Sequence, residues 1–214
     1  GTFPDHLYHK YRLVILDLSS NLFEGPINAS IGRGSALGFI NLADNSFTGR
    51  PLESDICFAL GESLATLVLA GNSFEGELPI CDKVKALRYL DISQNEFSGT
   101  IPRDFLKFLP NILTSLRLHG NAFTGSLPDT LYDITSLKYL TLNSNRLGSS
   151  ISARISKLSN LRTLDLRFNQ FRGSIPDSIA NLTQLRNVLF GNNQFSGTLP
   201  AGLRPVGPDC DFDV

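Results

Sequence analysis

Short stretches in which leucine or isoleucine alternates with other residues recur along nearly the whole chain. Aligned on a recurring asparagine, each stretch reads L-x-x-L-x-L-x-x-N-x-F-x-G-x-I/L-P. The L-x-L part has a period of two, which predicts a short strand with one buried face. The expected buried pairs are Leu16/Leu18, Ile40/Leu42, Leu67/Leu69, Leu90/Ile92, Leu116/Leu118, Leu140/Leu142, Leu164/Leu166 and Val188/Phe190.

The asparagine that ends each predicted strand recurs every 23 to 27 residues. It stands at Asn21, Asn45, Asn72, Asn95, Asn121, Asn145, Asn169 and Asn193. A period in this range is typical of a solenoid, in which each repeat is one unit stacked on its neighbours. Stacking would place the strands side by side in a parallel sheet, about 4.8 Å apart. We expect the asparagine amides to satisfy backbone groups where the chain turns inward.

Three further columns follow each asparagine. The first is aromatic and is expected to form a core spine: Phe23, Phe47, Phe74, Phe97, Phe123, Phe171 and Phe195. The second is a glycine column, suited to backbone with positive φ: Gly25, Gly49, Gly76, Gly99, Gly125, Gly173 and Gly197. The third is a proline column at Pro79, Pro102, Pro128, Pro176 and Pro200, expected to begin an outer stretch with short helical turns.

The whole phrase, with its G-x-I-P ending, resembles the plant-type leucine-rich repeat. The resemblance implies an α/β solenoid: a right-handed superhelix of eight repeats of about 24 residues, with a parallel sheet on the concave face and helical turns on the convex face. We expect the repeat domain at residues 13–200, after a flank at residues 1–12 without a cysteine cap and before a tail or partial cap at residues 201–214. Repeat six departs from the pattern, with Leu147, Ser149 and Ser152 in place of Phe, Gly and Pro.

Composition and motifs narrow the function classes. The net charge is −1, from 19 Lys and Arg against 20 Asp and Glu, and no basic run is present, so neither nucleic acid nor an anionic membrane is an expected partner. No apolar stretch approaches the roughly 20 residues that span a bilayer. No nucleophile elbow, phosphate loop or metal-ligand spacing occurs, so we expect no enzyme activity, no cofactor and no metal.

Cysteines and sequons suggest a secretory compartment. Cys57 and Cys81 occupy nearly the same phase on adjacent repeats, which favours a disulfide over two buried free thiols. Cys210 stands where the resembled family often has a cap cysteine, but its partner is missing. The sequons at Asn28 and Asn181 are candidate glycosylation sites away from the strand face. We therefore expect an extracellular or cell-surface location, in a mature or excised ectodomain.

The candidate ligand surface is the outward side of the strands in repeats four to seven. Nothing in the core requires aromatic or charged residues there, and their types are those enriched in binding hot spots. The candidates are Tyr89, Asp91, Arg117, His119, Tyr139, Arg167 and Phe168. An unperturbed histidine titrates near 6.5, so His119 beside Arg117 suggests pH-dependent binding.

Three functions fit these features. The leading hypothesis is a receptor-like ectodomain, or part of one, that binds a peptide or protein in signalling or defence, with a co-receptor or a secreted enzyme as partner. The second is a secreted inhibitor of a cell-wall-degrading enzyme, resembling polygalacturonase-inhibiting proteins. The third is an ice-binding protein, suggested by small hydroxyls such as Thr100, Ser126 and Thr198 after the glycine column but interrupted by Arg50 and Glu77.

Overall fold

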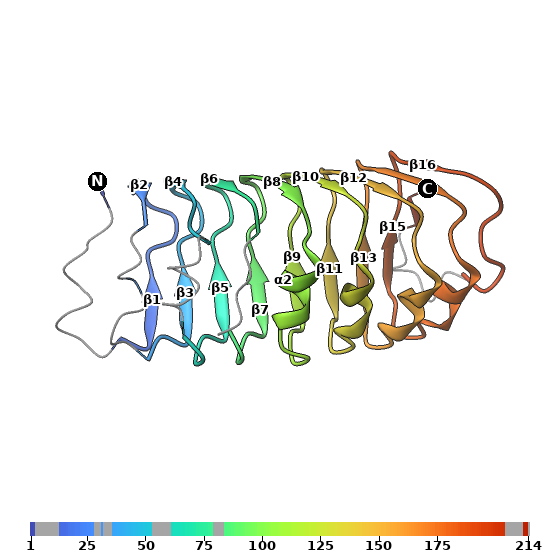
Figure 1. Ribbon diagram of the computed structural model, residues 1–214, viewed down its shortest axis with the longest axis horizontal. Helices are drawn as coiled ribbons and strands as arrows, with labels where there is room; N and C mark the ends of the chain where they lie inside the picture. Colours follow the sequence, from blue (N-terminus) through green and yellow to red (C-terminus); the bar gives the residue numbers. More distant parts are fainter. Residues whose placement is uncertain are drawn as a thin grey trace.

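The computed structural model describes residues 1–2, 13–27, 31, 36–52, 61–78, 84–203 and 212–213, which form a solenoid (Figure 1). Its first sheet is entirely parallel, with strands ordered as the repeats are in the sequence. These strands are β1 (Ile15–Asp17), β3 (Phe39–Asn41), β5 (Thr66–Val68), β7 (Tyr89–Asp91), β9 (Ser115–Arg117), β11 (Tyr139–Thr141), β13 (Thr163–Asp165), β15 (Asn187–Leu189) and β17 (Phe212–Asp213). The predicted leucine-rich solenoid is thus confirmed, and β17 extends its sheet from within the C-terminal tail.

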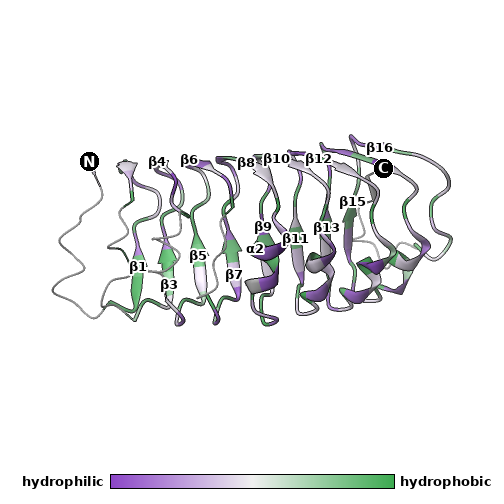
Figure 2. Ribbon diagram, viewed as in Figure 1, coloured by the Kyte–Doolittle hydropathy of each residue, from purple (hydrophilic) through white to green (hydrophobic). Residues whose placement is uncertain are grey.

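Each first-sheet strand from β1 to β15 turns its central residue into the core. Leu16, Leu90 and Leu140, for example, are at most 6% exposed. Figure 2 shows hydrophobic and hydrophilic residues mixed along these strands, as expected when one face is buried and the other is open.

A second parallel sheet follows the asparagine column, and sequence analysis did not predict it. It contains β2 (Glu24–Pro26), β4 (Ser46–Gly49), β6 (Ser73–Gly76), β8 (Glu96–Thr100), β10 (Ala122–Gly125), β12 (Arg146–Ser149), β14 (Gln170–Gly173) and β16 (Gln194–Phe195). These strands run along the upper edge of the solenoid in Figure 1. The F-x-G segment forms them because its phenylalanine points inward while the residues on either side point outward.

The outer stretches contain the expected short helical turns. They are the α-helix α2 (Arg103–Phe108) and the 3₁₀ helices η3 (Asp129–Asp133), η4 (Ala153–Lys157) and η5 (Asp177–Asn181). Three of them begin directly after a proline of the predicted column, and η4 begins after Ser152, whose side chain accepts a hydrogen bond from the amide of Arg154. Each turn buries apolar residues such as Leu106, Leu131, Ile155 and Ile179.

The aromatic column forms the predicted spine. Phe47, Phe74, Phe97, Phe123 and Phe171 have no exposed surface, and Leu147 takes their place in repeat six, also fully buried. Neighbouring rings stack almost parallel, with centroids 5.9 Å apart for Phe23 and Phe47 and 6.4 Å apart for Phe97 and Phe123. The spine therefore joins consecutive turns through direct contact.

The asparagine column joins consecutive turns through hydrogen bonds. Asn145 accepts from the amide of Phe123 in the turn before it (3.0 Å) and donates to the carbonyl of Leu118 in that same turn (3.0 Å). It also donates to the carbonyl of Leu142 within its own turn (3.0 Å). The same pattern repeats at Asn45, Asn72, Asn95, Asn121, Asn169 and Asn193.

Some sequence predictions lie outside the described residues. These are the Cys57–Cys81 disulfide, the state of Cys210 and the sequon at Asn28. They stay predictions.

The buried spine predicts a large loss of stability on truncation. Phe123→Ala should lower the free energy of unfolding by about 3–5 kcal/mol, because it leaves a cavity between stacked turns. A denaturant melt measures the effect, and Phe168→Ala, at a half-exposed position, is the control. A loss below about 1 kcal/mol for Phe123→Ala would contradict its place in the core.

The asparagine column predicts a position-dependent effect. Asn145→Ala should cost about 2 kcal/mol or more, because it leaves buried backbone groups of two turns unpaired. Asn21→Ala is the matched control, since among the described residues the exposed Asn21 side chain bonds only to the carbonyls of Leu18 and Ser19 in its own turn. Equal losses in the two denaturant melts would show that the bonds between turns contribute little.

The glycine column predicts a stabilising substitution in repeat six. Ser149 has a φ of +101°, at the position where other repeats have glycine. Ser149→Gly should therefore raise the free energy of unfolding by about 1 kcal/mol through relief of backbone strain. Ser150→Gly, at the neighbouring exposed position without positive φ, should be neutral or destabilising. The idea fails if both changes lower the melting temperature equally.

Candidate functional site

The predicted ligand residues lie on strands β7, β9 and β11 and on the turns that follow β9 and β13. Strand pairing places Tyr89, Ser115 and Tyr139 in one row across the outward side. Asp91, Arg117, Thr141 and Asp165 form the next row. We call this surface, with His119, Arg167 and Phe168 after the strands, the concave face.

Arg117 is the centre of the first group on the concave face. Its guanidinium carbon lies 5.2 Å from the centroid of the Tyr89 ring, and its Nη1 lies 3.8 Å from Oδ2 of Asp91. The Tyr89 hydroxyl donates to that same oxygen at 3.3 Å. Asp91 is almost completely covered, whereas the Arg117 side chain is 39% exposed. A ligand on this group would therefore meet the arginine and tyrosine before the carboxylate.

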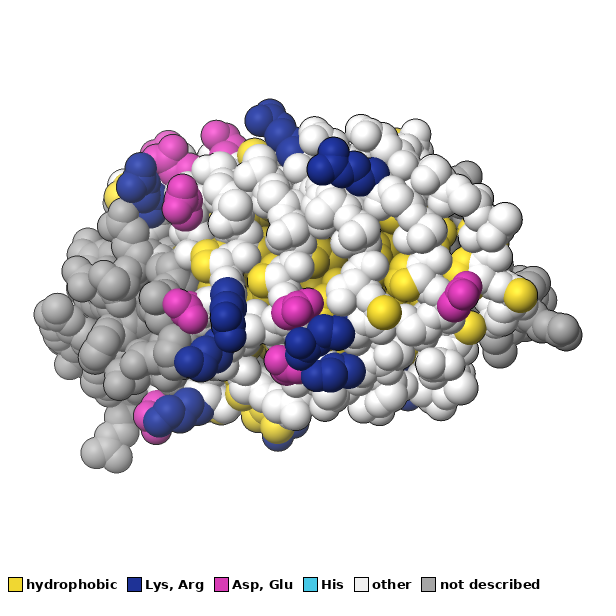
Figure 3. All heavy atoms as spheres, turned by 45° about the vertical axis from the view of Figure 1, so that its right-hand side comes forward, with side chains coloured by type: hydrophobic (Ala, Val, Ile, Leu, Met, Phe, Trp, Pro, Cys, Tyr) yellow, Lys and Arg dark blue, Asp and Glu magenta, His cyan; other side chains and the backbone are white. Residues whose placement is uncertain are grey.

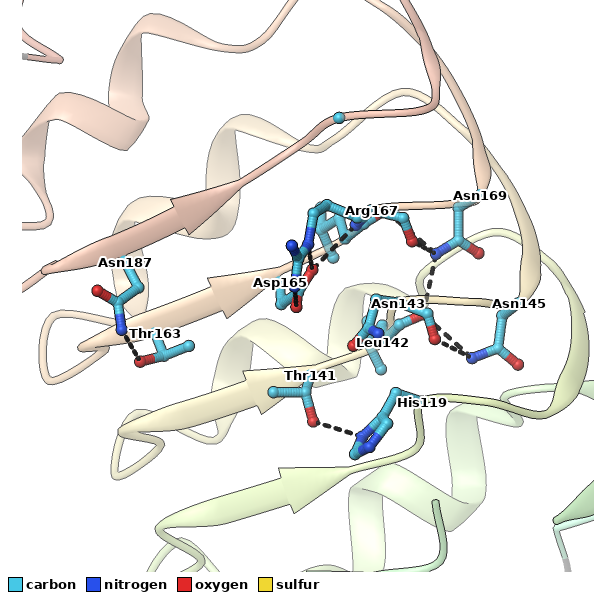
Figure 4. A network of polar contacts seen from close by, with 12 residues as sticks. His119, Thr141, Leu142, Asn143, Asn145, Thr163, Asp165, Arg167, Asn169 and Asn187 are labelled. Carbon is cyan, nitrogen blue, oxygen red and sulfur yellow. Dashed lines mark hydrogen bonds and ion pairs between the residues drawn. The ribbon is translucent and has the colours of Figure 1, made fainter. Parts of the chain in front are cut away.

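Arg167 and Asp165 form a second group. The guanidinium donates through Nε to Oδ1 (3.1 Å) and through Nη2 to Oδ2 (2.8 Å), a bidentate pair visible in Figure 4. Bidentate pairs hold the planar guanidinium in one orientation. Asp165 is buried, and one third of the Arg167 side chain is exposed. The carboxylate thus orients an arginine that still faces solvent.

The two buried aspartates also have a local structural role. Asp91 accepts a hydrogen bond from the amide of Ser93, two residues on, and Asp165 accepts one from the amide of Arg167. Asp17 and Asn41 do the same in repeats one and two. Asp and Asn commonly bond their own backbone in this way. Of the two, only Asp91 was among the residues predicted from the sequence, and both aspartates support contact side chains of the concave face.

His119 lies in the middle of the concave face and is half-buried. Its Nδ1 is 3.1 Å from Oγ1 of Thr141 (Figure 4). Burial is the main cause that lowers its pKa, assisted by Arg117, while Asp91 and Asp165 act in the opposite direction. The imidazole is therefore neutral at neutral pH, and its charge change is displaced toward more acidic conditions than an ordinary histidine would show.

Two aromatic side chains are exposed on this face. Tyr139 is 38% exposed and Phe168 is 52% exposed. Phe168 also has a φ of +54°, in a column of residues with left-handed backbone that elsewhere consists of Ser20, Asp44, Gly71, Gln94, Gly120, Ser144 and Asn192. A bulky aromatic residue is uncommon in this conformation. Phe168 is thus unfavourable for folding for two reasons: its apolar ring is exposed, and its backbone is left-handed.

Two buried polar atoms on the concave face lack a hydrogen-bond partner within the described part of the chain. They are Oγ of Ser115 and Nε of Arg117. Ser115 is 1% exposed because it lies between Tyr89 and Tyr139 in their row. Ser115 was not among the predicted residues, since a serine in an outward strand position carries no distinctive signal. The Arg117 nitrogen offers unused donor capacity next to the exposed guanidinium.

Charges of both signs are mixed on the surface of the solenoid. In Figure 3, Lys and Arg side chains stand beside Asp and Glu side chains near the middle of the molecule. Among the described residues, no cluster of His, Cys, Asp and Glu could hold a metal ion. Within the same residues, no helix is long and apolar enough to cross a bilayer.

Comparisons with known proteins agree with this architecture. The family model described as leucine rich repeat matches residues 85–147, and a model of two leucine-rich-repeat copies matches residues 135–176. The chain is 37% identical over 136 residues to Receptor-like protein 53 of Arabidopsis thaliana. That match covers 62% of this chain and only 13% of the relative, so the chain spans a small part of that protein's length.

Solved structures resemble the chain over most of its length. The Arabidopsis receptor kinase HAESA, in complex with the peptide hormone IDA and the co-receptor SERK1, has a TM-score of 0.86 at 28% identity, covering 96% of this chain and 38% of that one. A plant ice-binding protein has a TM-score of 0.76 at 25% identity, covering 86% and 58% of the two chains. Taken with the repeat phrase and the two parallel sheets, these matches show that the chain is a leucine-rich-repeat solenoid that is similar to plant receptor-like proteins.

Proposed function

We propose that the chain is the ligand-binding part of an extracellular, receptor-like ectodomain, and that the concave face binds a peptide. The observation that carries the proposal is the pair of solvent-facing arginines, Arg117 and Arg167, beside the exposed aromatic side chains of Tyr139 and Phe168. The solved receptor kinase in complex with a peptide hormone and a co-receptor supports it, because that protein has the same fold over 96% of this chain.

The residues of the concave face define the chemistry of the ligand. Arg117 and Arg167 suit a carboxylate, either the C-terminus of a peptide or an acidic side chain. Tyr139 and Phe168 offer apolar area for one hydrophobic side chain, at low cost in conformational freedom. A short acidic peptide with one large apolar residue satisfies both groups.

Buried carboxylates below the arginines prepare this face for binding. Asp165 holds Arg167 through two hydrogen bonds, so little of that side chain's freedom is left to lose when a ligand binds. The neighbouring aspartates partly compensate the charge of each arginine. This limits the free-energy cost of the concave face when no ligand is bound. Preorganised contacts of this kind favour specific recognition.

An extracellular location is part of the proposal. Asn181 and Thr183 of one predicted glycosylation site are both exposed, at and just after the end of η5. This helical turn lies outside the first sheet, so a glycan there would leave the concave face open. A membrane-anchored parent chain, a co-receptor and a role in signalling or defence belong to the same proposal.

The two alternative functions find less support on the surface. An ice-binding face needs a regular, flat array, but the outward side of the second sheet carries charged, exposed residues of both signs: Arg50, Glu75, Glu77, Glu96, Arg146 and Arg172. Inhibition of a secreted enzyme would also use an exposed protein-binding surface. It is therefore an alternative outcome of the peptide-binding experiment.

The proposal predicts which substitutions abolish peptide binding. Peptides selected from a phage-displayed random library on the immobilised chain should be acidic with one large apolar residue. Arg117→Ala, Tyr139→Ala and Arg167→Ala should each weaken the selected peptides by more than about 1 kcal/mol, measured by calorimetry, without changing the thermal melt.

Gln184→Ala is the control for this experiment, since Gln184 is exposed and lies outside the concave face. A peptide whose affinity survives all three concave-face changes, or depends on exposed residues of α2, would disprove the site. Enrichment of no peptide, with binding of a secreted cell-wall-degrading enzyme instead, would favour the inhibitor function.

A further inference from the structure

The outward side of the second sheet contains a depression of about 460 Å³, between strands β10, β12, β14 and β16. Polar side chains line it, and neither an aspartate, a glutamate nor any apolar side chain is among them. Guanidinium and amide groups come from Arg146, Arg172, Gln170 and Gln194. We call this surface the second-sheet pocket, and it shares no residue with the concave face.

The second-sheet pocket exists because repeat six lacks one outward side chain. Gly148 fills the repeat position at which the neighbouring repeats have Thr124 and Arg172, and in the sheet it pairs with Gln170. A Cβ atom added to Gly148 would lie 3.3 Å from the backbone oxygen of Gln170, tighter than an ordinary contact. The glycine therefore keeps the floor of the pocket open.

The backbone does not require glycine at this position. Gly148 is not among the glycines with positive φ, whereas the next residue, Ser149, has a φ of +101° where seven other repeats have glycine. Repeat six thus places its glycine one residue too early for the turn, and Ser149 is strained as a result. A local loss of stability that opens a cavity is typical of a functional site.

The charges in the second-sheet pocket call for an anionic ligand. Arg146 and Arg172 are both exposed, and neither forms an ion pair with a described residue. This differs from the concave face, where both arginines approach buried aspartates. Guanidinium groups bind carboxylates in a planar, bidentate manner.

The remaining groups call for a ligand rich in hydroxyls. The amides of Gln170 and Gln194 can donate and accept hydrogen bonds. The hydroxyls of Thr124 and Ser149 donate to the carbonyls of Gly99 and Ser150 and can still accept. No apolar side chain is present to receive a hydrophobic part of a peptide. The volume is at the small end of the range for ligand sites, which fits one to three sugar units.

We propose that the second-sheet pocket binds an acidic saccharide, with a carboxylate between Arg146 and Arg172 and ring hydroxyls on Gln170 and Gln194. This inference does not depend on peptide binding at the concave face. It gives the chain a second ligand surface, on a different side of the same repeats.

The test uses a trisaccharide of galacturonic acid as the probe, with its carboxyl-reduced, neutral counterpart as the matched chemical control. Calorimetry at low salt should detect the acidic trisaccharide only, and added salt should weaken it because the contacts are exposed. The double variant Arg146→Gln/Arg172→Gln should weaken binding by at least about tenfold. Gly148→Leu should do the same by filling the pocket.

Two control variants show whether the trisaccharide binds at the second-sheet pocket. Arg50→Gln removes a positive charge from the same side of the second sheet and should leave the affinity unchanged. The triple change Arg117→Ala/Tyr139→Ala/Arg167→Ala on the concave face should also leave it unchanged, so failure of the peptide site and failure of this site are distinguishable. If the thermal melt shows that the Gly148→Leu variant is not folded, the arginine double variant still tests whether the trisaccharide binds at the second-sheet pocket.

Three results would overturn the inference. The neutral trisaccharide could bind as well as the acidic one, which would exclude a role for the arginines. Inorganic sulfate could displace the trisaccharide at equal concentration, which would reduce the pocket to a simple anion site. The acidic trisaccharide could also bind the double variant with undiminished affinity, which would place it elsewhere on the chain.

Discussion

The structure depends on one side-chain amide that joins each turn of the solenoid to the turn before it. An asparagine at the end of a first-sheet strand accepts from the backbone of the preceding turn and donates to a carbonyl of that turn, as Asn145 does with Phe123 and Leu118. These backbone groups are buried where the chain leaves one sheet for the other, and unpaired they would be costly. Because the amide has both a donor and an acceptor, no apolar or purely accepting side chain could replace it.

This dependence explains why the repeat was readable from the sequence and the second sheet was not. The L-x-L period, the asparagine and the phenylalanine each follow from burial, and burial leaves a clear hydrophobic pattern. The second-sheet strands have at most one fully buried residue each, such as Phe123 in β10, so no alternation marks them. Their pairing follows from the stacking of the turns, which the asparagines fix. It therefore depends on contacts between repeats, and the pattern within one repeat does not show it.

The candidate site was only partly predictable, for a related reason. The outward positions of Tyr89, Arg117 and Tyr139 follow from strand register, and the structure places them there. The sequence does not show that Asp91 and Asp165 are covered, because that results from arginines and tyrosines on the same or neighbouring strands. Nor does it show that Phe168 has left-handed backbone, since only the turn geometry shared by all repeats reveals the mismatch.

Departures from the repeat are therefore more informative about function than the repeat itself. Each turn needs a residue with left-handed backbone directly before its asparagine and a glycine two residues after its phenylalanine, and most turns have both. Repeat seven puts Phe168 at the first position, and repeat six puts Ser149 at the second. Both exceptions cost stability, and each lies beside exposed arginines on a different surface. Only three residues separate Phe168 from Arg172, and one of them is the buried Asn169 between the two sheets. The same turn thus presents one candidate contact to each of the two proposed ligand surfaces.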